Sequence, residues 1–158
     1  MDDAADSGPD EAGIYALDSE YLECAVQVGM ASGKVIRVTV PSEPDPEAAT
    51  ENSLLDRIDG YLSGLEEEDF SDVEVGLTVP TDHRAVLEAV RTVPYGTEVP
   101  VEKLARMAAG VDPDDEETVR TALDGNPVPL IVPDHRVRNG PSGAPPRVEQ
   151  RLRSLEGL

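Results

Sequence analysis

The sequence predicts an α+β protein. A small N-terminal mixed α/β domain with a strand hairpin precedes a mostly helical C-terminal domain of the winged-helix or helix-turn-helix type. The hairpin is indicated by alternating apolar residues at 34–40, which follow the turn-forming pair Ser32 and Gly33. The helical part is indicated by two short helical patterns, at about 101–109 and 113–123, that a Gly-containing turn separates.

The chain divides into three expected segments: a disordered acidic tail at 1–10, an N-terminal α/β domain at 11–79 and a helix-turn-helix domain at 80–158. The N-terminal domain is predicted to hold four strands, at 13–18, 21–28, 34–40 and 73–79. In the third strand, alternation places three residues on one face: Ile36, Val38 and Val40. A helix at about 51–63 is predicted by apolar residues at helical spacing: Leu54, Leu55, Ile58 and Leu62. The acidic loop at 66–69 is expected to be solvated.

The C-terminal domain is expected to begin just after Pro80 with a helix capped by Thr81 or Asp82. His83 is interpreted as a surface residue at the start of this helix. One face of the helix collects the apolar residues Val86, Leu87 and Val90. These features predict a helix that packs on the remainder of the domain.

The helix-turn-helix candidate follows. Its first helix, at about 101–109, is expected to stop at Gly110. Asp112 is expected to cap the second helix, with a proline at the first helical position, and this helix runs to about Leu123. A last helix is predicted at about 146–155.

The charge of the chain is strongly negative, with 33 acids, 13 bases and a formal net charge of −20. Residues 1–80 hold 20 of the acids and 3 of the bases. One interpretation is halophilic adaptation, in which a hydrated carboxylate surface keeps the protein in solution at high salt. The other is an acidic surface that imitates nucleic acid or binds a basic partner. The acids are spread along the chain instead of gathered in one tract, which favours halophilic adaptation.

The arginines concentrate toward the C-terminus. Residues 118–158 carry six arginines and four acids. Two explanations remain open: these arginines bind an anion, or they pair with nearby acids and with the acidic N-terminal half.

Several classes of protein do not fit this composition. No apolar run reaches the length of about 18 residues that a membrane-spanning helix needs. The acidic, polar start does not resemble a secretory signal peptide. The single cysteine, Cys24, excludes an internal disulfide and is interpreted as a small buried residue of a strand. These features favour a cytoplasmic protein. We also expect a monomer that needs no cofactor.

The segment 126–137 carries the most informative motif. It reads Asn-Pro, then Val128 to Val132, then Pro-Asp-His-Arg-Val, and a Glu-Gly pair follows at 156–157. This pattern resembles the O6-alkylguanine-DNA alkyltransferase family, also called methylated-DNA–protein-cysteine methyltransferases, whose hallmark is Asn-Pro followed by Pro-Cys-His-Arg-Val. Further similar segments are Val93-Pro94-Tyr95-Gly96, Leu104-Ala105 and Leu152-Arg153-Ser154-Leu155-Glu156-Gly157. The resemblance is strong over residues 93–157.

The resemblance implies a site at which an alkylated guanine, turned out of the duplex, faces a cysteine thiolate. It makes His135 the base that acts through a water, Glu156 its orienting partner and Asn126 the residue that tightens the turn. The nucleophile position is occupied by Asp134. A carboxylate is a weaker nucleophile than a thiolate, and an ionised one has no proton for His135 to remove, so we expect no alkyl transfer.

Other positions also depart from the family pattern. Val101 stands where the family has a Tyr that helps to turn out the nucleotide. Glu117 stands where the family has an Arg that fills the vacated space, and Arg120 lies one turn further on. The acids at 114–117 repel phosphates unless salt screens them, and the loop 140–146 is shorter than its family counterpart. The DNA contacts, if made, are expected from Thr118, Arg120, Thr121, Arg136 and Arg138.

Alternative functions remain open. The first is an alkyltransferase-like protein that recognises duplex DNA containing alkylated guanine without accepting the alkyl group. The second is a protein-interaction or regulatory module on a retired repair fold. Less favoured are residual methyl transfer and a metal or hydrolytic site built from Asp134, His135 and Glu156. The simplest structural explanation of Asp134 is a hydrogen bond or salt bridge with His135 or Arg136.

Overall fold

The computed structural model describes residues 12–158, so the acidic tail expected at 1–10 lies outside the described residues. The chain forms two compact units. The first extends to Glu68 and includes Asp72–Gly76, and the second comprises Asp69–Ser71 and Leu77–Leu158. Within residues 12–158, no helix is long and apolar enough to cross a membrane.

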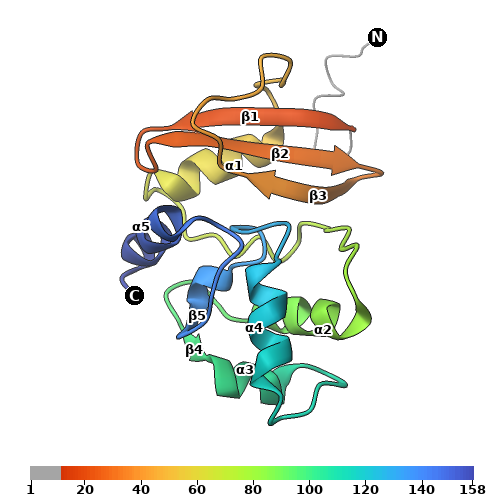
Figure 1. Ribbon diagram of the computed structural model, residues 1–158. Helices are drawn as coiled ribbons and strands as arrows, with labels where there is room; N and C mark the ends of the chain where they lie inside the picture. Colours follow the sequence, from red (N-terminus) through yellow and green to blue (C-terminus); the bar gives the residue numbers. More distant parts are fainter. Residues whose placement is uncertain (1–11) are drawn as a thin grey trace. The chain divides into compact units, whose positions relative to one another are not determined.

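The first unit is a three-stranded antiparallel sheet with one helix. The strands β1 (Gly13–Ser19), β2 (Cys24–Ala31) and β3 (Lys34–Thr39) lie in that order, and α1 (Ser53–Leu62) packs against β1 (Figure 1). Asn52 begins the helix, because its side-chain oxygen accepts a hydrogen bond from the Leu54 N–H at 2.7 Å. The core is built from side chains of the sheet and of the helix: Tyr15, Val26, Val28, Val35, Val38, Leu54, Leu55, Ile58, Tyr61 and Leu62.

The second strand begins at Cys24, later than the sequence pattern predicted. The residues before it form a turn, in which the Glu23 N–H donates to the Ser19 carbonyl at 2.9 Å and the Leu22 N–H donates to the Ser19 hydroxyl at 3.1 Å. Leu22 is buried in this turn without belonging to a strand. Because Leu22 is apolar, the sequence pattern placed the start of this strand at residue 21, whereas the strand begins at Cys24.

The third strand was predicted with Ile36 on the same face as Val38, but only Val38 of these two is buried. Met30 pairs with Val35 but Gly29 pairs with Arg37, so β3 carries one extra residue at this point. A bulge of this kind reverses the alternation of faces. As a result Val35 is buried and Ile36 is 44% exposed.

The fourth strand expected at 73–79 is not formed. The segment makes one isolated bridge, between Val75 and Val35, closed by hydrogen bonds of 2.9 Å from the Val35 N–H to the Glu74 carbonyl and from the Gly76 N–H to the Val35 carbonyl. Glycine in a strand weakens pairing, which is consistent with a contact of this length at Gly76.

The second unit is mostly helical. The helices α2 (Thr81–Val90), α3 (Val101–Met107) and α4 (Glu116–Asp124) pack against one another, and α5 (Pro146–Glu156) packs against a short 3-10 helix, Asp134–Arg136. The two-residue strands β4 (Val99–Pro100) and β5 (Val137–Arg138) pair in parallel (Figure 1). The sequence did not predict these strands, because two residues are too few to show a periodicity.

The helix start signals were only partly right. Asp115 caps α4, since its carboxylate accepts hydrogen bonds from the Thr118 N–H at 3.1 Å and the Thr118 hydroxyl at 2.7 Å. Asp112, the expected cap, instead accepts from the Asp114 N–H at 2.8 Å within the preceding turn. The connection 108–115 is therefore longer than the tight turn that was expected. Pro80 occupies the N-cap position of α2 and Asp82 lies in its first turn.

Candidate functional site

Asn126 shapes the turn that leads from α4 into the 126–137 segment. Its side-chain N–H group donates to the Val132 carbonyl at 3.1 Å and to the Asp134 carboxylate at 3.0 Å, and its side-chain oxygen accepts from the Val128 N–H at 3.0 Å. One buried amide thus ties both ends of residues 128–134 together. This is the position that a turn-tightening residue must have.

Asp134 lies at the start of the 3-10 helix and is 1% exposed. Oδ1 accepts a hydrogen bond from the Ser142 hydroxyl at 2.7 Å, and Oδ2 accepts from the Gly143 N–H at 2.7 Å as well as from Asn126. Burial raises the pKa of Asp134, and the hydrogen bonds from Ser142, Gly143 and Asn126 oppose that shift. The carboxylate therefore serves as the acceptor that attaches the 142–144 segment to the turn.

Glycine at 143 is required for this attachment. A Cβ atom at Gly143 would lie 2.2 Å from the backbone oxygen of Asn126, far inside van der Waals contact. Only a residue without a side chain can bring its N–H group this close to Asp134. The sequence gives no signal for the roles of Ser142 and Gly143, because these roles depend on where the loop closes.

Glu156, the last residue of α5, is the shared side-chain partner of His135 and Arg136. Its Oε2 lies 2.8 Å from His135 Nε2, and it accepts from Arg136 through Nε at 2.8 Å and Nη2 at 2.9 Å. The backbone N–H of Gly96 donates to Oε1 at 3.0 Å. The structure thus brings Glu156 and His135 together as the resemblance implied.

Arg136 is an internal residue, although it was expected to contact DNA. It is 2% exposed, and besides Glu156 it donates through Nη1 to the Asp69 carboxylate at 3.0 Å and to the Val93 carbonyl at 2.9 Å. Its guanidinium carbon also lies 5.7 Å from the centre of the Tyr95 ring. These contacts leave no exposed surface for a phosphate, so its position argues against a DNA contact.

Asp69 belongs to the acidic loop that was expected to be merely solvated. In addition to Arg136, its carboxylate accepts a hydrogen bond from the Tyr95 N–H at 2.7 Å. The sequence offered no signal for this role, because 67 residues separate Asp69 from Arg136.

The other C-terminal arginines divide between internal and exposed positions. Arg153 donates to the His135 carbonyl at 2.8 Å and to Glu98 at 2.6 Å, so it connects the backbone of the 3-10 helix to Glu98. Arg138 is half exposed and lies 3.4 Å from the same Glu98 carboxylate. Pairing with nearby acids, one of the two explanations left open, therefore accounts for Arg136, Arg138 and Arg153.

The outer face of α4 carries the remaining DNA-contact candidates. Arg120 is exposed, donates to the Asn139 carbonyl at 2.5 Å and lies 3.8 Å from Glu116. Thr121 is exposed, whereas the Thr118 hydroxyl is used in capping. Glu117 is exposed in the first turn of the helix, so a phosphate approaching here meets acids beside one arginine.

A metal site is not supported. Among residues 12–158, no group of three or more histidine, cysteine, aspartate or glutamate side chains is arranged to hold a metal ion. The reason is visible in the contacts: Glu156 is engaged by His135 and Arg136, while Asp134 is engaged by the 142–143 segment. The arrangement therefore does not support the interpretation of these residues as a metal centre. The described hydrogen bonds of Asp134 come from Asn126, Ser142 and Gly143, and His135 adds an electrostatic attraction that lowers its pKa.

Known proteins resemble the chain in both sequence and fold. The family model described as "6-O-methylguanine DNA methyltransferase, DNA binding domain" matches residues 82–155. A methylated-DNA–protein-cysteine methyltransferase of Methanopyrus kandleri is 39% identical over 106 residues, which cover 65% of this chain and 77% of that protein. The protein of the same name from Metallosphaera sedula is 33% identical over 105 residues, covering 65% of this chain and 64% of that protein.

Solved structures agree on the fold. The crystal structure of Mycobacterium tuberculosis OGT in complex with DNA has a TM-score of 0.69 at 21% identity, covering 92% of this chain and 91% of that chain. The O6-methylguanine-DNA methyltransferase of Pyrococcus kodakaraensis has a TM-score of 0.61 at 20% identity, covering 92% of this chain and all of that chain. At this level of identity the likeness shows a shared α+β fold.

Replacing Glu156 by Gln is expected to lower the free energy of unfolding by about 3–5 kcal/mol, because Arg136 stays buried without its full counter-charge. Urea denaturation followed by circular dichroism measures the loss. Glu98→Gln is the matched control, since it also removes a carboxylate with two arginine partners but at a more exposed position. Its loss should be clearly smaller than that of Glu156→Gln, because solvent screens an exposed ion pair. Equal losses in the two variants would contradict this account.

Asp134→Asn is expected to change how stability depends on pH. Burial raises the folded-state pKa of Asp134, so the stability that it contributes is present below its unfolded pKa of about 3.9 and is lost as the pH rises through the folded value. The amide does not titrate, so the difference in unfolding free energy should shift in favour of Asp134→Asn between pH 4 and pH 8. Ser142→Ala removes a donor that lowers this pKa and should extend the loss of stability to higher pH. Parallel pH profiles for Asp134→Asn and the wild type would refute the prediction.

Proposed function

Because the chain belongs to the O6-methylguanine DNA methyltransferase family and carries its DNA-binding domain over residues 82–155, we propose that it is a DNA-repair protein that recognises alkylated guanine in duplex DNA without taking the alkyl group onto itself. The observation that carries the proposal is the buried Asp134 carboxylate, held by three hydrogen-bond donors at the position that the family motif gives to cysteine.

The absence of transfer is supported by the chemistry of the available nucleophiles. The named relatives are protein-cysteine methyltransferases, and this chain contains one cysteine. Cys24 is 7% exposed within β2, in the other compact unit. Hydrogen bonds to both oxygens of Asp134 lower its nucleophilicity further, and attack on an alkyl carbon would disrupt them.

Binding to DNA is supported by the matched domain and by the likeness to a protein solved in complex with DNA. The Glu156 cluster, although it has no thiol to activate, fixes the 3-10 helix and so preserves the shape of the site. The exposed Arg120 of α4 offers a phosphate contact.

A second candidate is a protein-interaction or regulatory module. It is favoured by Glu116 and Glu117, which lie in the first turn of α4 and repel a phosphate backbone. Screening by molar salt reduces this repulsion to contacts within about 3 Å. DNA binding must therefore be measured at both low and molar salt before the two candidates can be distinguished.

We expect the full chain to bind a duplex with one O6-methylguanine more tightly than the unmodified duplex, at low KCl, at molar KCl or at both. Fluorescence anisotropy with labelled duplexes measures the two affinities. Arg120→Ala should weaken binding roughly fivefold, corresponding to about 1 kcal/mol. Arg37→Ala, an exposed arginine of β3, is the matched control and should leave the affinity unchanged. No binding at any salt concentration would reject DNA recognition and leave the interaction module.

We expect no transfer of the methyl group. After incubation with duplex DNA that carries an isotopically labelled O6-methyl group, the label should stay on the DNA and none should be found on the protein by mass spectrometry. The Methanopyrus kandleri relative, assayed in parallel, is the positive control. Label on the protein, or loss of the lesion without label on the protein, would overturn the proposed role of Asp134.

A further inference from the structure

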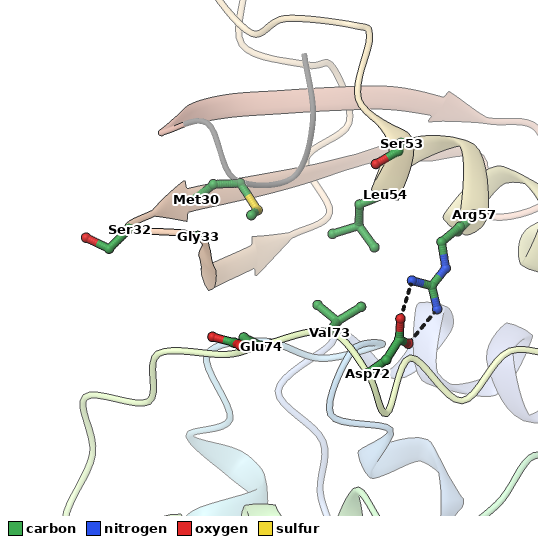
Figure 2. A pocket seen from close by; sticks show the side chains of 9 residues that line it. All are labelled: Met30, Ser32, Gly33, Ser53, Leu54, Arg57, Asp72, Val73 and Glu74. Atoms are coloured by element: carbon green, nitrogen blue, oxygen red, sulfur yellow. Dashed lines mark hydrogen bonds and ion pairs between the residues drawn. The ribbon is translucent and has the colours of Figure 1, made fainter. Parts of the chain in front are cut away.

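The first unit contains a pocket of about 580 Å³ that the proposed function does not use. It lies where the turn between β2 and β3, the first turns of α1 and the segment 72–74 meet (Figure 2). All of its lining residues belong to this one compact unit. The volume lies in the range of pockets that bind ligands or side chains of a partner.

The inner wall of the pocket is apolar. Met30 and Leu54 are 4% and 3% exposed, and together with the half-buried Val73 they point into the same space (Figure 2). Methylene groups laid against these side chains would be removed from water, which is favourable. The wall therefore suits a long aliphatic stem better than a compact hydrated ion.

The charge that faces the pocket is negative. Arg57 is the basic residue of its lining, and its guanidinium is already engaged by two carboxylates, Glu68 at 2.8 and 3.0 Å and Asp72 at 2.8 and 3.0 Å. The Asp72 side chain remains 71% exposed, and Glu74 is exposed on the same segment. One guanidinium balances one of these carboxylates, so acidic groups remain in excess.

The charged residues of the whole first unit make the electrostatic potential around the pocket more negative. Residues 12–76 contain 15 acids against Lys34, Arg37 and Arg57. A nucleic-acid phosphate or another anion is repelled from such a surface, whereas a cation is attracted. A ligand that satisfies both the apolar wall and the acidic rim has an aliphatic stem with a positive end, which is the chemistry of lysine and arginine side chains.

We propose that this pocket is a docking site for a basic segment of a partner protein. A lysine or arginine side chain of that segment lies along Met30, Leu54 and Val73 and directs its charge to Asp72 and Glu74. Neighbouring residues of the segment occupy the rest of the volume. The proposal goes beyond DNA recognition and holds whether or not the second unit binds DNA.

The test uses the full chain and a fluorescein-labelled nonapeptide of lysine, leucine and alanine, with anisotropy measured in about 0.1 M KCl. Saturable binding is expected, and a peptide with glutamate in place of each lysine should not bind. Glu74→Gln and Val73→Ser should each weaken binding roughly two- to fivefold, the first by removing a rim charge and the second by shortening the apolar wall. Neither change alters the backbone pairing of Glu74 with Val35.

Glu43→Gln is the matched control, because Glu43 is exposed in the same unit but outside the pocket lining. It should change the affinity less than Glu74→Gln does. Equal effects of the two variants would show general attraction to an acidic surface and overturn the proposal, as would the lack of saturable binding. Spermidine should not displace the peptide when both supply the same concentration of positive charges. If it does, the pocket is not specific for a basic polypeptide segment and the proposal fails.

Discussion

The buried Glu156 carboxylate is the interaction on which the second unit depends. It joins the end of α5 to the 3-10 helix through His135 and Arg136, and to the 93–96 turn through Gly96. A buried guanidinium is tolerated only with a close counter-charge and satisfied N–H groups. The position of each of these segments therefore depends on the others. Gly157, with a φ of 80°, ends α5 immediately after Glu156.

The need to neutralise carboxylates also determines where the few arginines of this chain lie. Arg136 and Arg153 stabilise the interior of the second unit, and Arg57 joins two acids within the first. Arginine suits these places because its planar fork binds two acceptors at once. Arg120 is left on the outer face of α4 beside acids, so a DNA-binding role must rest on few charges and on the shape of the fold.

Asp134 occupies the motif position next to His135 and acts in the structure as a hydrogen-bond acceptor. Its carboxylate accepts from Ser142, Gly143 and Asn126, so it supports a closed loop. A thiolate would offer one acceptor atom to these donors, whereas a carboxylate offers two with more lone pairs. The positions of Asp134 and of the loop that closes on it therefore depend on each other.

The sequence by itself determined the α+β class, the amphipathic helices and the family, because periodicity and motif spacing are local properties. It also placed Glu156 beside His135, through the resemblance. The tertiary structure alone decided that Arg136 is buried on Asp69, that Ile36 faces outward and that Gly143 reaches Asp134. Each of these depends on a pairing between distant residues, on an extra residue in a strand or on the closure of a loop. No local pattern encodes such contacts, since their free energy is realised only when the separate segments pack together.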